Sequence, residues 1–207
     1  MVDFRFYLIS DRTRCAGRSL ASALGEACRA GVRAVQIREK DLDTSDLLTL
    51  TRKVRDELGE CRPLVMVNSN PEVAAAGGAQ GVHLPERSMS ARAARDRLPA
   101  GTMIARSTHS VNAAREAEAE GVDFITFGPV YDTPSKAAYG PAKGLQALSE
   151  TARAVTIPVF ALGGVTPGRT TECLEAGAFG VAAISAVLSR PDIPGAVGAF
   201  EKALGGL

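Results

Sequence analysis

The sequence lacks a long apolar run and has no surplus of charge of either sign. No stretch approaches the ~20 apolar residues of a membrane-spanning helix, and the beginning of the chain has no signal-peptide pattern. The formal net charge of +1 argues against a general nucleic-acid-binding surface, which needs clustered positive charge. We therefore expect a cytoplasmic protein that binds neither membranes nor nucleic acids.

The sequence is also poor in cysteine and in the signatures of common catalytic sites. Its cysteines are widely spaced with no Cys-x-x-Cys pair, so we expect buried free thiols at Cys15, Cys28, Cys61 and Cys173. No Asp, Glu and His residues have the spacing of a metal site, and no Gly-x-Ser-x-Gly turn presents a nucleophile. No Gly-x-Gly-x-x-Gly follows the first apolar run, which removes the main signature of a dinucleotide-binding fold.

Short apolar runs alternate instead with helix-like segments along the chain. The expected strands are Phe4–Ile9, Arg33–Ile37, Leu64–Val67, Gly81–Leu84, Thr102–Ala105, Val122–Phe127, Ile157–Leu162 and Gly180–Ile184. The expected helices lie near residues 18–30, 45–58, 71–76, 90–97, 111–120, 145–154, 167–176 and 194–204.

The pattern of these units indicates the fold class. The runs are apolar throughout, as in parallel strands that are covered on both faces. Eight strand–helix units most naturally close into a barrel. We expect an α/β protein with a single (β/α)8 TIM-barrel domain over residues 1–207, and a doubly wound open sheet is the alternative.

In such a barrel the active site lies at the carboxyl ends of the strands. Polar residues or glycines follow every expected strand at that end: Ser10–Asp11, Gln36, Arg38, Lys40, Asn68–Ser69, His83, Ser107–His109, Thr133–Lys136, Gly163–Gly164 and Ser185. Gly163–Gly164 and Ser185 each precede a helix start after the last two strands, where backbone N–H groups commonly bind phosphate. The alternative is that the two glycines form only a tight turn.

A second anion site is predicted from three cations. Arg38 and Lys40 are two residues apart at the end of the second strand, so both can face the barrel mouth with Lys136. The alternative is that Arg38 and Lys40 are surface charges paired with Glu39 and Asp41. Lys136 lies in a long connection, residues 128–144, that also supplies the hydroxyls of Thr133 and Ser135. The alternative is that residues 128–144 form a solvated surface loop. The sequence does not decide whether this loop closes over a substrate.

The two histidines receive different interpretations. His109 is the best acid–base candidate, because imidazole titrates close to neutral pH. His83 directly follows an apolar run, and we interpret it as a hydrogen-bonded core residue.

Taken together and in order, these segments resemble the thiamine phosphate synthase/TenI superfamily over nearly the whole chain. The matching segments are Tyr7–Asp11, Val35–Lys40, Val67–Asn68, Gly81–Leu84, Ser107–Ser110, Phe127–Tyr131, Thr133–Lys136, Gly163–Val165 and Ile184–Ser185. The resemblance implies a (β/α)8 barrel that acts in thiamine biosynthesis. Synthases of this family join a hydroxymethylpyrimidine diphosphate to a thiazole phosphate and release pyrophosphate.

The resemblance also implies roles for individual residues. Those expected around the pyrimidine diphosphate are Gln36, Arg38, Lys40, Asn68, Ser107, Thr133, Ser135 and Lys136. Those expected to hold the thiazole phosphate are Gly164, Ile184 and Ser185.

Two departures from the synthase pattern concern the metal. Similar synthases hold Mg²⁺ with two Asp residues, and this chain has Ser69 and Ser88 at those positions. Serine hydroxyls are poor replacements for carboxylates around a hard cation. Glu86 or Asp11 would be substitutes, but neither occupies a matching position. We therefore expect no metal ligand and no cofactor, or Mg²⁺ if the protein is a synthase after all.

Three functions remain on these grounds. The first is a metal-independent TenI-type thiazole tautomerase, in which His109 moves a proton on a carboxythiazole phosphate. The alternative is a divergent thiamine phosphate synthase, which the segments from Gln36 to Lys40 and from Thr133 to Lys136 favour. A second alternative is a non-catalytic phosphate-ligand binder or regulator. Each implies a small phosphorylated molecule as partner, and the sequence leaves the oligomeric state open, a homo-oligomer included.

Overall fold

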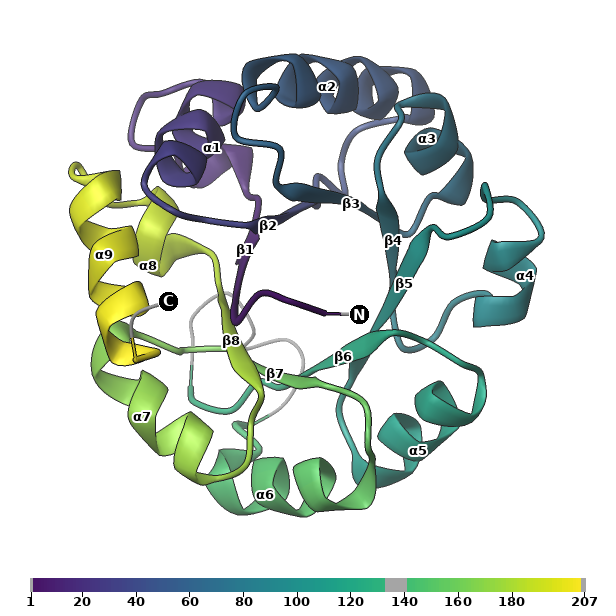
Figure 1. Ribbon diagram of the computed structural model, residues 1–207, viewed down its shortest axis with the longest axis vertical. Helices are drawn as coiled ribbons and strands as arrows, with labels where there is room; N and C mark the ends of the chain where they lie inside the picture. Colours follow the sequence, from purple (N-terminus) through teal and green to yellow (C-terminus); the bar gives the residue numbers. More distant parts are fainter. Residues whose placement is uncertain (1, 133–140, 206–207) are drawn as a thin grey trace.

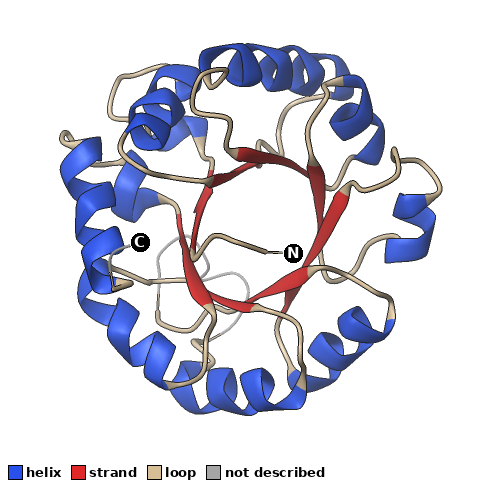
Figure 2. Ribbon diagram, in the orientation of Figure 1, coloured by secondary structure: helices blue, strands red, loops and turns tan. Residues whose placement is uncertain are grey.

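The computed structural model describes residues 2–132 and 141–205. Its eight parallel strands pair in chain order and close into a barrel, with helices around the outside (Figure 1, Figure 2). The strands are β1 (Phe6–Ile9), β2 (Ala34–Ile37), β3 (Leu64–Asn68), β4 (Gly81–Leu84), β5 (Met103–Thr108), β6 (Phe124–Phe127), β7 (Val159–Leu162) and β8 (Gly180–Ala183). Because β1 pairs with β8, with Phe6 opposite Val181, the predicted (β/α)8 barrel is confirmed and the open-sheet alternative is wrong.

The helices follow the strands as predicted, with two short additions. They are α1 (Leu20–Arg29), α2 (Thr44–Glu57), α3 (Pro71–Ala76), α4 (Ala91–Arg95), α5 (Val111–Ala119), α6 (Gly144–Ala154), α7 (Pro167–Glu175), α8 (Ser185–Leu188) and α9 (Ile193–Ala203). The sequence interpretation missed α8 and the 3₁₀ turn η1 (Arg12–Arg14). Both are too short to produce a helical periodicity. No helix of the described segments is long and apolar enough to cross a membrane.

Several strand boundaries differ from the prediction for one physical reason. Phe4 and Val122 are buried although they precede β1 and β6, and a buried apolar residue next to a strand cannot be told from a strand residue in the sequence. The opposite error occurred at β5, which was predicted to end at Ala105 but continues to Thr108. Its last residues are polar yet still pair with β6, with Thr108 opposite Phe127. Ser107 therefore lies within a strand and not after it.

The barrel interior is packed with side chains. Tyr7 and Ile9 of β1 face inward, whereas Phe6 and Leu8 face the helices, as the strand alternation requires. Tyr7 lies among Phe4, Phe124 and Phe160, with ring centroids 5.4 Å from Phe124 and 6.0 Å from Phe4.

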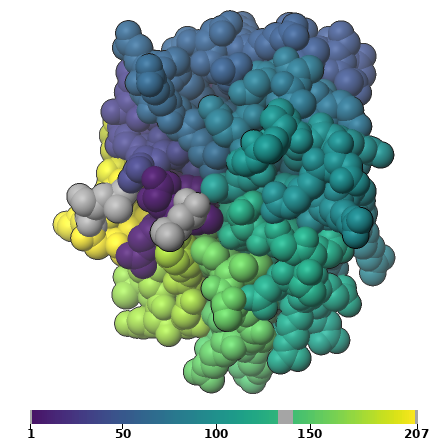
Figure 3. Space-filling view, turned by 45° about the vertical axis from the view of Figure 1, so that its right-hand side comes forward, coloured from purple at the N-terminus to yellow at the C-terminus, as the bar shows by residue number. Residues whose placement is uncertain are grey.

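The segment that carries Phe4 crosses the amino-terminal end of the barrel in Figure 1, and the purple start of the chain fills this part of the surface in Figure 3. The other end of the barrel, where the strands finish, is the one at which active sites of this fold lie.

Candidate functional site

A cavity of about 240 Å³ lies at the carboxyl ends of the strands, and we call it the central cavity. It is lined by the predicted site residues Gln36, Arg38, Lys40, Asn68, Ser107, His109 and Ile184, and also by Ile9, Asp11, His83, Pro85, Glu86 and Leu162. These side chains come from β1 to β5 and from the ends of β7 and β8. The structure thus brings together residues that are far apart in the sequence. Thr133, Ser135 and Lys136 lie outside the described residues.

A second cavity, of about 290 Å³, lies beside the ends of β7 and β8, and we call it the β7–β8 cavity. It is lined by Gly163, Gly164 and Ser185, the residues for which the sequence predicts phosphate binding. Leu162 and Ile184 line both cavities, so the two spaces adjoin. Two small molecules bound one in each cavity would meet at these two side chains.

The glycines of the β7–β8 cavity are required by close packing. Gly163 and Gly164 have φ angles of +97° and +66°, where other residues are strained. A Cβ at Gly163 would lie 2.6 Å from Pro129 Cα, and one at Gly164 would lie 2.8 Å from Tyr131 Cβ. Gly163 and Gly164 therefore form a tight turn that requires glycine at both positions. Phosphate binding by the backbone of this turn remains a prediction. The N-cap residue of α8 is Ile184, whose apolar side chain cannot accept a hydrogen bond from the first N–H groups of that turn.

Sequence reasoning missed two arginines and an acid that line the β7–β8 cavity: Arg169, Arg190 and Asp132. Arg169 Nη1 donates to Gly164 O at 2.8 Å, and its guanidinium lies 4.4 Å from the centre of the Tyr131 ring. Burial raises the pKa of Tyr131, so the phenol stays neutral. Arg169 lies on α7, and Arg190 lies in the connection between α8 and α9. Arginines in such outer segments look like ordinary surface residues in a sequence, so no signal distinguishes them.

His109 is held in an orientation suited to proton transfer. Its Nδ1 lies 2.5 Å from the carbonyl oxygen of Gly128, and its backbone N donates to Glu86 Oε2 at 2.6 Å. Because a carbonyl oxygen can only accept, Nδ1 carries a proton. In the neutral ring Nε2 then has the lone pair, and this is the atom that could accept or return a proton.

His83 has the predicted structural character although it also lines the central cavity. It is buried, with Nε2 2.9 Å from Ser107 Oγ and Nδ1 3.4 Å from the Tyr7 hydroxyl. Gln36 Nε2 donates to the same hydroxyl at 3.0 Å. Burial raises the pKa of Tyr7 far above its ordinary value, so the phenol remains protonated. This buried network fixes the orientations of Gln36 and Ser107 beneath the cavity.

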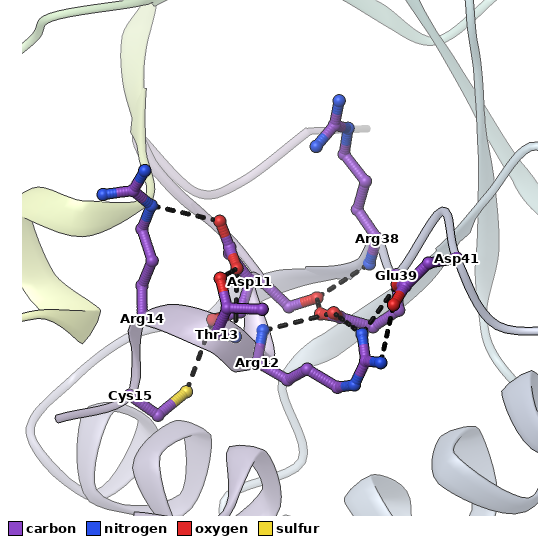
Figure 4. Close-up of polar contacts among 9 residues, drawn as sticks. Asp11, Arg12, Thr13, Arg14, Cys15, Arg38, Glu39 and Asp41 are labelled. Atoms are coloured by element: carbon purple, nitrogen blue, oxygen red, sulfur yellow. Dashed lines mark hydrogen bonds and ion pairs between the residues drawn. The ribbon is translucent and has the colours of Figure 1, made fainter. Parts of the chain in front are cut away.

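The carboxylates beside Arg38 and Lys40 turn away from the cavity. Both terminal nitrogens of Arg12 donate hydrogen bonds to the Asp41 carboxylate, at 2.6 Å each. The Arg12 backbone N donates to the Glu39 carboxylate at 3.1 Å. In Figure 4 the Arg38 guanidinium points away from both acids. The alternative that Arg38 is a surface charge paired with Glu39 or Asp41 is therefore wrong.

The positions expected to bind Mg²⁺ do not fit that ion. Asn68 Nδ2 donates to Ser69 Oγ at 2.6 Å, and Ser88 Oγ donates to the carbonyl of Pro85 at 2.7 Å. Asp11 caps η1 and pairs with Arg14, and Glu86 already accepts from the His109 backbone. Within residues 2–132 and 141–205, no three His, Cys, Asp or Glu side chains are grouped as a metal would require.

The cysteine prediction holds in part. All four thiols are free, and Cys15, Cys28 and Cys173 are buried. Burial raises the pKa of Cys28 to about 12 and also raises the pKa of Cys173, so these thiols are unreactive at neutral pH. Cys61 is exposed, which corrects the prediction, because it lies in the turn between α2 and β3.

Comparison with known proteins finds relatives that match nearly the whole chain. The family model described as "Thiamine monophosphate synthase" (TMP-TENI) matches residues 6–187. A Geobacter sulfurreducens protein named "Putative thiamine-phosphate synthase" is 48% identical over 92% of this chain and 90% of its own. The thiamine-phosphate synthase of Methanoculleus marisnigri is 37% identical over 93% of this chain and 92% of its own.

A solved structure agrees with these sequence relatives. It is the thiamine phosphate pyrophosphorylase of Pyrococcus furiosus, which is 30% identical, covers 97% of this chain and 95% of its own, and superposes with a TM-score of 0.87. A 3-hexulose-6-phosphate synthase superposes with a TM-score of 0.70 at 16% identity, which shows a shared fold alone.

Proposed function

The chain belongs to the thiamine monophosphate synthase (TMP-TENI) family, and on that premise we propose that it is a thiamine-phosphate synthase. It would join hydroxymethylpyrimidine diphosphate to a thiazole phosphate and release pyrophosphate. The sequence alone ranked this function second, after a thiazole tautomerase. The names of the relatives and of the solved structure favour the synthase.

The observation that carries the proposal is the pair of adjoining cavities. A synthase must bring two phosphorylated substrates together, whereas a tautomerase handles one. The central cavity has Arg38 and Lys40 for the diphosphate, and the β7–β8 cavity has the glycine turn and Arg169 for the phosphate. The reacting ends would meet at Leu162 and Ile184, which line both spaces.

In this reaction the protein must stabilise a diphosphate that leaves with additional negative charge. Fixed cations aimed at the leaving group supply such stabilisation without reorganisation during the reaction. Arg38 and Lys40 would do so here, and Gln36 and Asn68 would orient the pyrimidine by hydrogen bonds. Because Ser69 and Ser88 do not fit a Mg²⁺ site, we assign no step to a metal.

One observation favours the tautomerase as a second candidate. The bond from His109 Nδ1 to Gly128 O leaves Nε2 as the proton-transfer atom at the cavity, and this arrangement needs no metal. A tautomerase would use it to move a proton between two carbons of a carboxythiazole phosphate.

A paired assay on the full chain tests the proposal. One arm supplies both synthase substrates and measures thiamine phosphate and pyrophosphate, with Mg²⁺ and with chelator. The other supplies the carboxythiazole tautomer alone. We expect product in the first arm and a loss of about a hundredfold or more in kcat/KM for Arg38→Met, equivalent to removing one charge-assisted contact with the leaving group.

Matched variants sharpen the result. Arg97→Met removes an exposed ion pair with Glu72 and should leave the rate unchanged. The double substitution Ser69→Asp and Ser88→Asp should make the rate depend more strongly on Mg²⁺ than that of the natural sequence. Aromatisation that persists in chelator and disappears in His109→Ala, with no pyrophosphate in the first arm, would establish the tautomerase instead. Activity in neither arm would favour the non-catalytic binder.

A further inference from the structure

Glu39 is a buried carboxylate between two cations that face the central cavity. Its side chain is only 3% exposed, whereas Arg38 and Lys40 on either side line the cavity. A carboxylate buried in this way is costly unless hydrogen bonds and a cation satisfy it. The contacts that satisfy Glu39 therefore show which neighbouring groups it holds in place.

Those contacts connect the first two strand ends. The Ser10 hydroxyl donates to Glu39 Oε1 at 2.5 Å. The Arg12 backbone N and Nη1 approach Glu39 Oε2 at 3.1 and 3.4 Å (Figure 4). The buried Ser10 hydroxyl oxygen also accepts a hydrogen bond from the Arg38 backbone N at 2.8 Å. A continuous chain of hydrogen bonds therefore runs from Glu39 through Ser10 to the backbone of Arg38.

The same contacts decide where the negative charges lie. Arg12 holds Glu39 with one terminal nitrogen and Asp41 with both, so each acid beside Lys40 is directed toward Arg12. Hydrogen bonding to Arg12 also lowers the pKa of Asp41, which therefore remains ionised while it is held there. Without this arrangement two carboxylates would be free to approach the cations that an anionic ligand needs.

We propose that Glu39 and Ser10 are positioning residues for anion binding in the central cavity. Through the Arg38 backbone they fix the strand end from which the Arg38 and Lys40 side chains reach the cavity. The inference rests on the proposed function, because it takes the anion to be the diphosphate of the pyrimidine substrate. Neither residue touches that ligand, so their effect is on affinity for the diphosphate and not on the reacting atoms.

Two substitutions break the chain of hydrogen bonds at different points. Ser10→Ala removes the hydroxyl that joins Glu39 to Arg38. Glu39→Gln keeps the side-chain shape but removes its charge and replaces one acceptor oxygen with a donor amide. The matched controls are Ser149→Ala on α6 and Glu72→Gln, whose carboxylate makes an exposed ion pair with Arg97.

The first measurement is calorimetric binding of inorganic pyrophosphate to the full chain, together with the thermal midpoint of each variant. We expect Ser10→Ala and Glu39→Gln to bind pyrophosphate about tenfold more weakly, because the Arg38 and Lys40 side chains are then held less firmly at the cavity. The controls should match the natural sequence. The second measurement is steady-state kinetics. KM for the pyrimidine diphosphate should rise by a similar factor while KM for the thiazole phosphate and kcat change less than about threefold.

The outcomes separate the two proposals. If the natural sequence binds pyrophosphate but makes no thiamine phosphate, the proposed synthase function is wrong. The ratio of pyrophosphate affinities between each variant and the natural sequence then still tests whether Glu39 and Ser10 are positioning residues. A lower thermal midpoint with unchanged pyrophosphate affinity would show a purely structural role and overturn the inference. An equal rise in both KM values, or no pyrophosphate binding by the natural sequence, would also overturn it. If Glu39→Gln does not fold, Ser10→Ala decides alone.

Discussion

Gly128 shows how a single residue connects the fold to the candidate site. It follows β6, and its carbonyl oxygen accepts the hydrogen bond from His109 Nδ1. A Cβ at this position would lie 2.0 Å from the carbonyl oxygen of Leu162, which belongs to the wall between the two cavities. Backbone atoms cannot rotate away as a flexible side chain can, so one of the two strand ends would have to move.

We therefore predict that Gly128→Ala destabilises the protein by about 3 kcal/mol or more, as expected of overpacking against backbone. The proposed synthase activity should fall even at temperatures where the variant is folded, because His109 and Leu162 are both displaced. Urea unfolding and steady-state kinetics measure the two effects.

Gly168→Ala is the matched control for Gly128→Ala. Gly168 lies in α7, and a Cβ there would have no atom within 4 Å. The variant should be more stable than the natural sequence by about 0.5–1 kcal/mol, because alanine has less freedom to lose on folding. Equal stability of Gly128→Ala and the natural sequence would contradict the predicted conflict with Leu162.

Individual site residues could be predicted where residue type and strand position agree. Gln36, Arg38 and Asn68 are polar residues at strand ends, and the structure places all three around one cavity. The positioning role proposed for Glu39 could not be predicted, because it depends on a hydrogen bond to Ser10, 29 positions earlier in the chain. Periodicity and residue type contain no information about such a contact.

At the scale of elements, helix starts could be predicted because side chains mark them. Ser19, Asp43 and Ser110 each accept a hydrogen bond from the backbone N three residues on, at the starts of α1, α2 and α5. The end of β5 could not be predicted, because Arg106 is charged yet only 7% exposed. Its Nη2 donates to Met89 O at 2.7 Å and so holds the loop between β4 and α4. Arg106 is thus a charge buried between the barrel and its helices, and this becomes visible only once the elements are packed together.

Glu118 joins two elements in a way that depends on pH. It lies near the end of α5, and its Oε1 accepts from the Thr156 backbone N at 2.6 Å, the Thr156 hydroxyl at 2.7 Å and the Ile157 N at 3.3 Å. The carboxylate therefore fixes the turn that leads into β7. The hydrogen bonds from Thr156 lower the pKa of Glu118 below its ordinary value of 4.5.

The sign of the pH effect follows from that lowered pKa. The folded protein favours the ionised carboxylate more than the unfolded chain does, so its contribution is complete above the ordinary pKa and is lost as pH falls through the lowered one. We predict that Glu118→Gln costs on the order of 1 kcal/mol at pH 7, a figure reduced by solvent screening. Urea unfolding should show this difference shrink between pH 5 and pH 3. An equal difference in unfolding free energy between Glu118→Gln and the natural sequence at pH 5 and pH 3 would contradict the prediction. Glu60→Gln, at an exposed position, serves as the control.

At the scale of the whole molecule, the two ends of the chain close the barrel together. β1 pairs with β8, and Arg5 donates to Phe179 O at 3.0 Å and to Leu204 O at 3.1 Å. Behind this seam the Phe6 ring stacks on Phe200 of α9, with centroids 4.5 Å apart. Closure of the barrel could be predicted from the eight repeated units. The individual contacts of this β1–β8 seam could not be predicted, because they join residues almost a full chain length apart. Since neither end can leave without exposing the other, we expect the barrel to unfold as one cooperative unit.

Phe200→Ala tests that expectation. Phe200 is fully buried, so the substitution should cost about 3–5 kcal/mol and lower the thermal midpoint by at least about 6 °C. Phe179→Ala removes the same side chain from a position that is 36% exposed, and it should cost less than about 1 kcal/mol.

The sequence has no tryptophan, so fluorescence reports on its tyrosines, among them Tyr7 in the barrel interior, while far-ultraviolet circular dichroism reports on the helices. In Phe200→Ala the two signals should change together at the lower temperature, because loss of the α9 contact opens the β1–β8 seam. If helix signal is lost first while the tyrosine signal persists, α9 separates without opening the barrel, and the single cooperative unit is wrong.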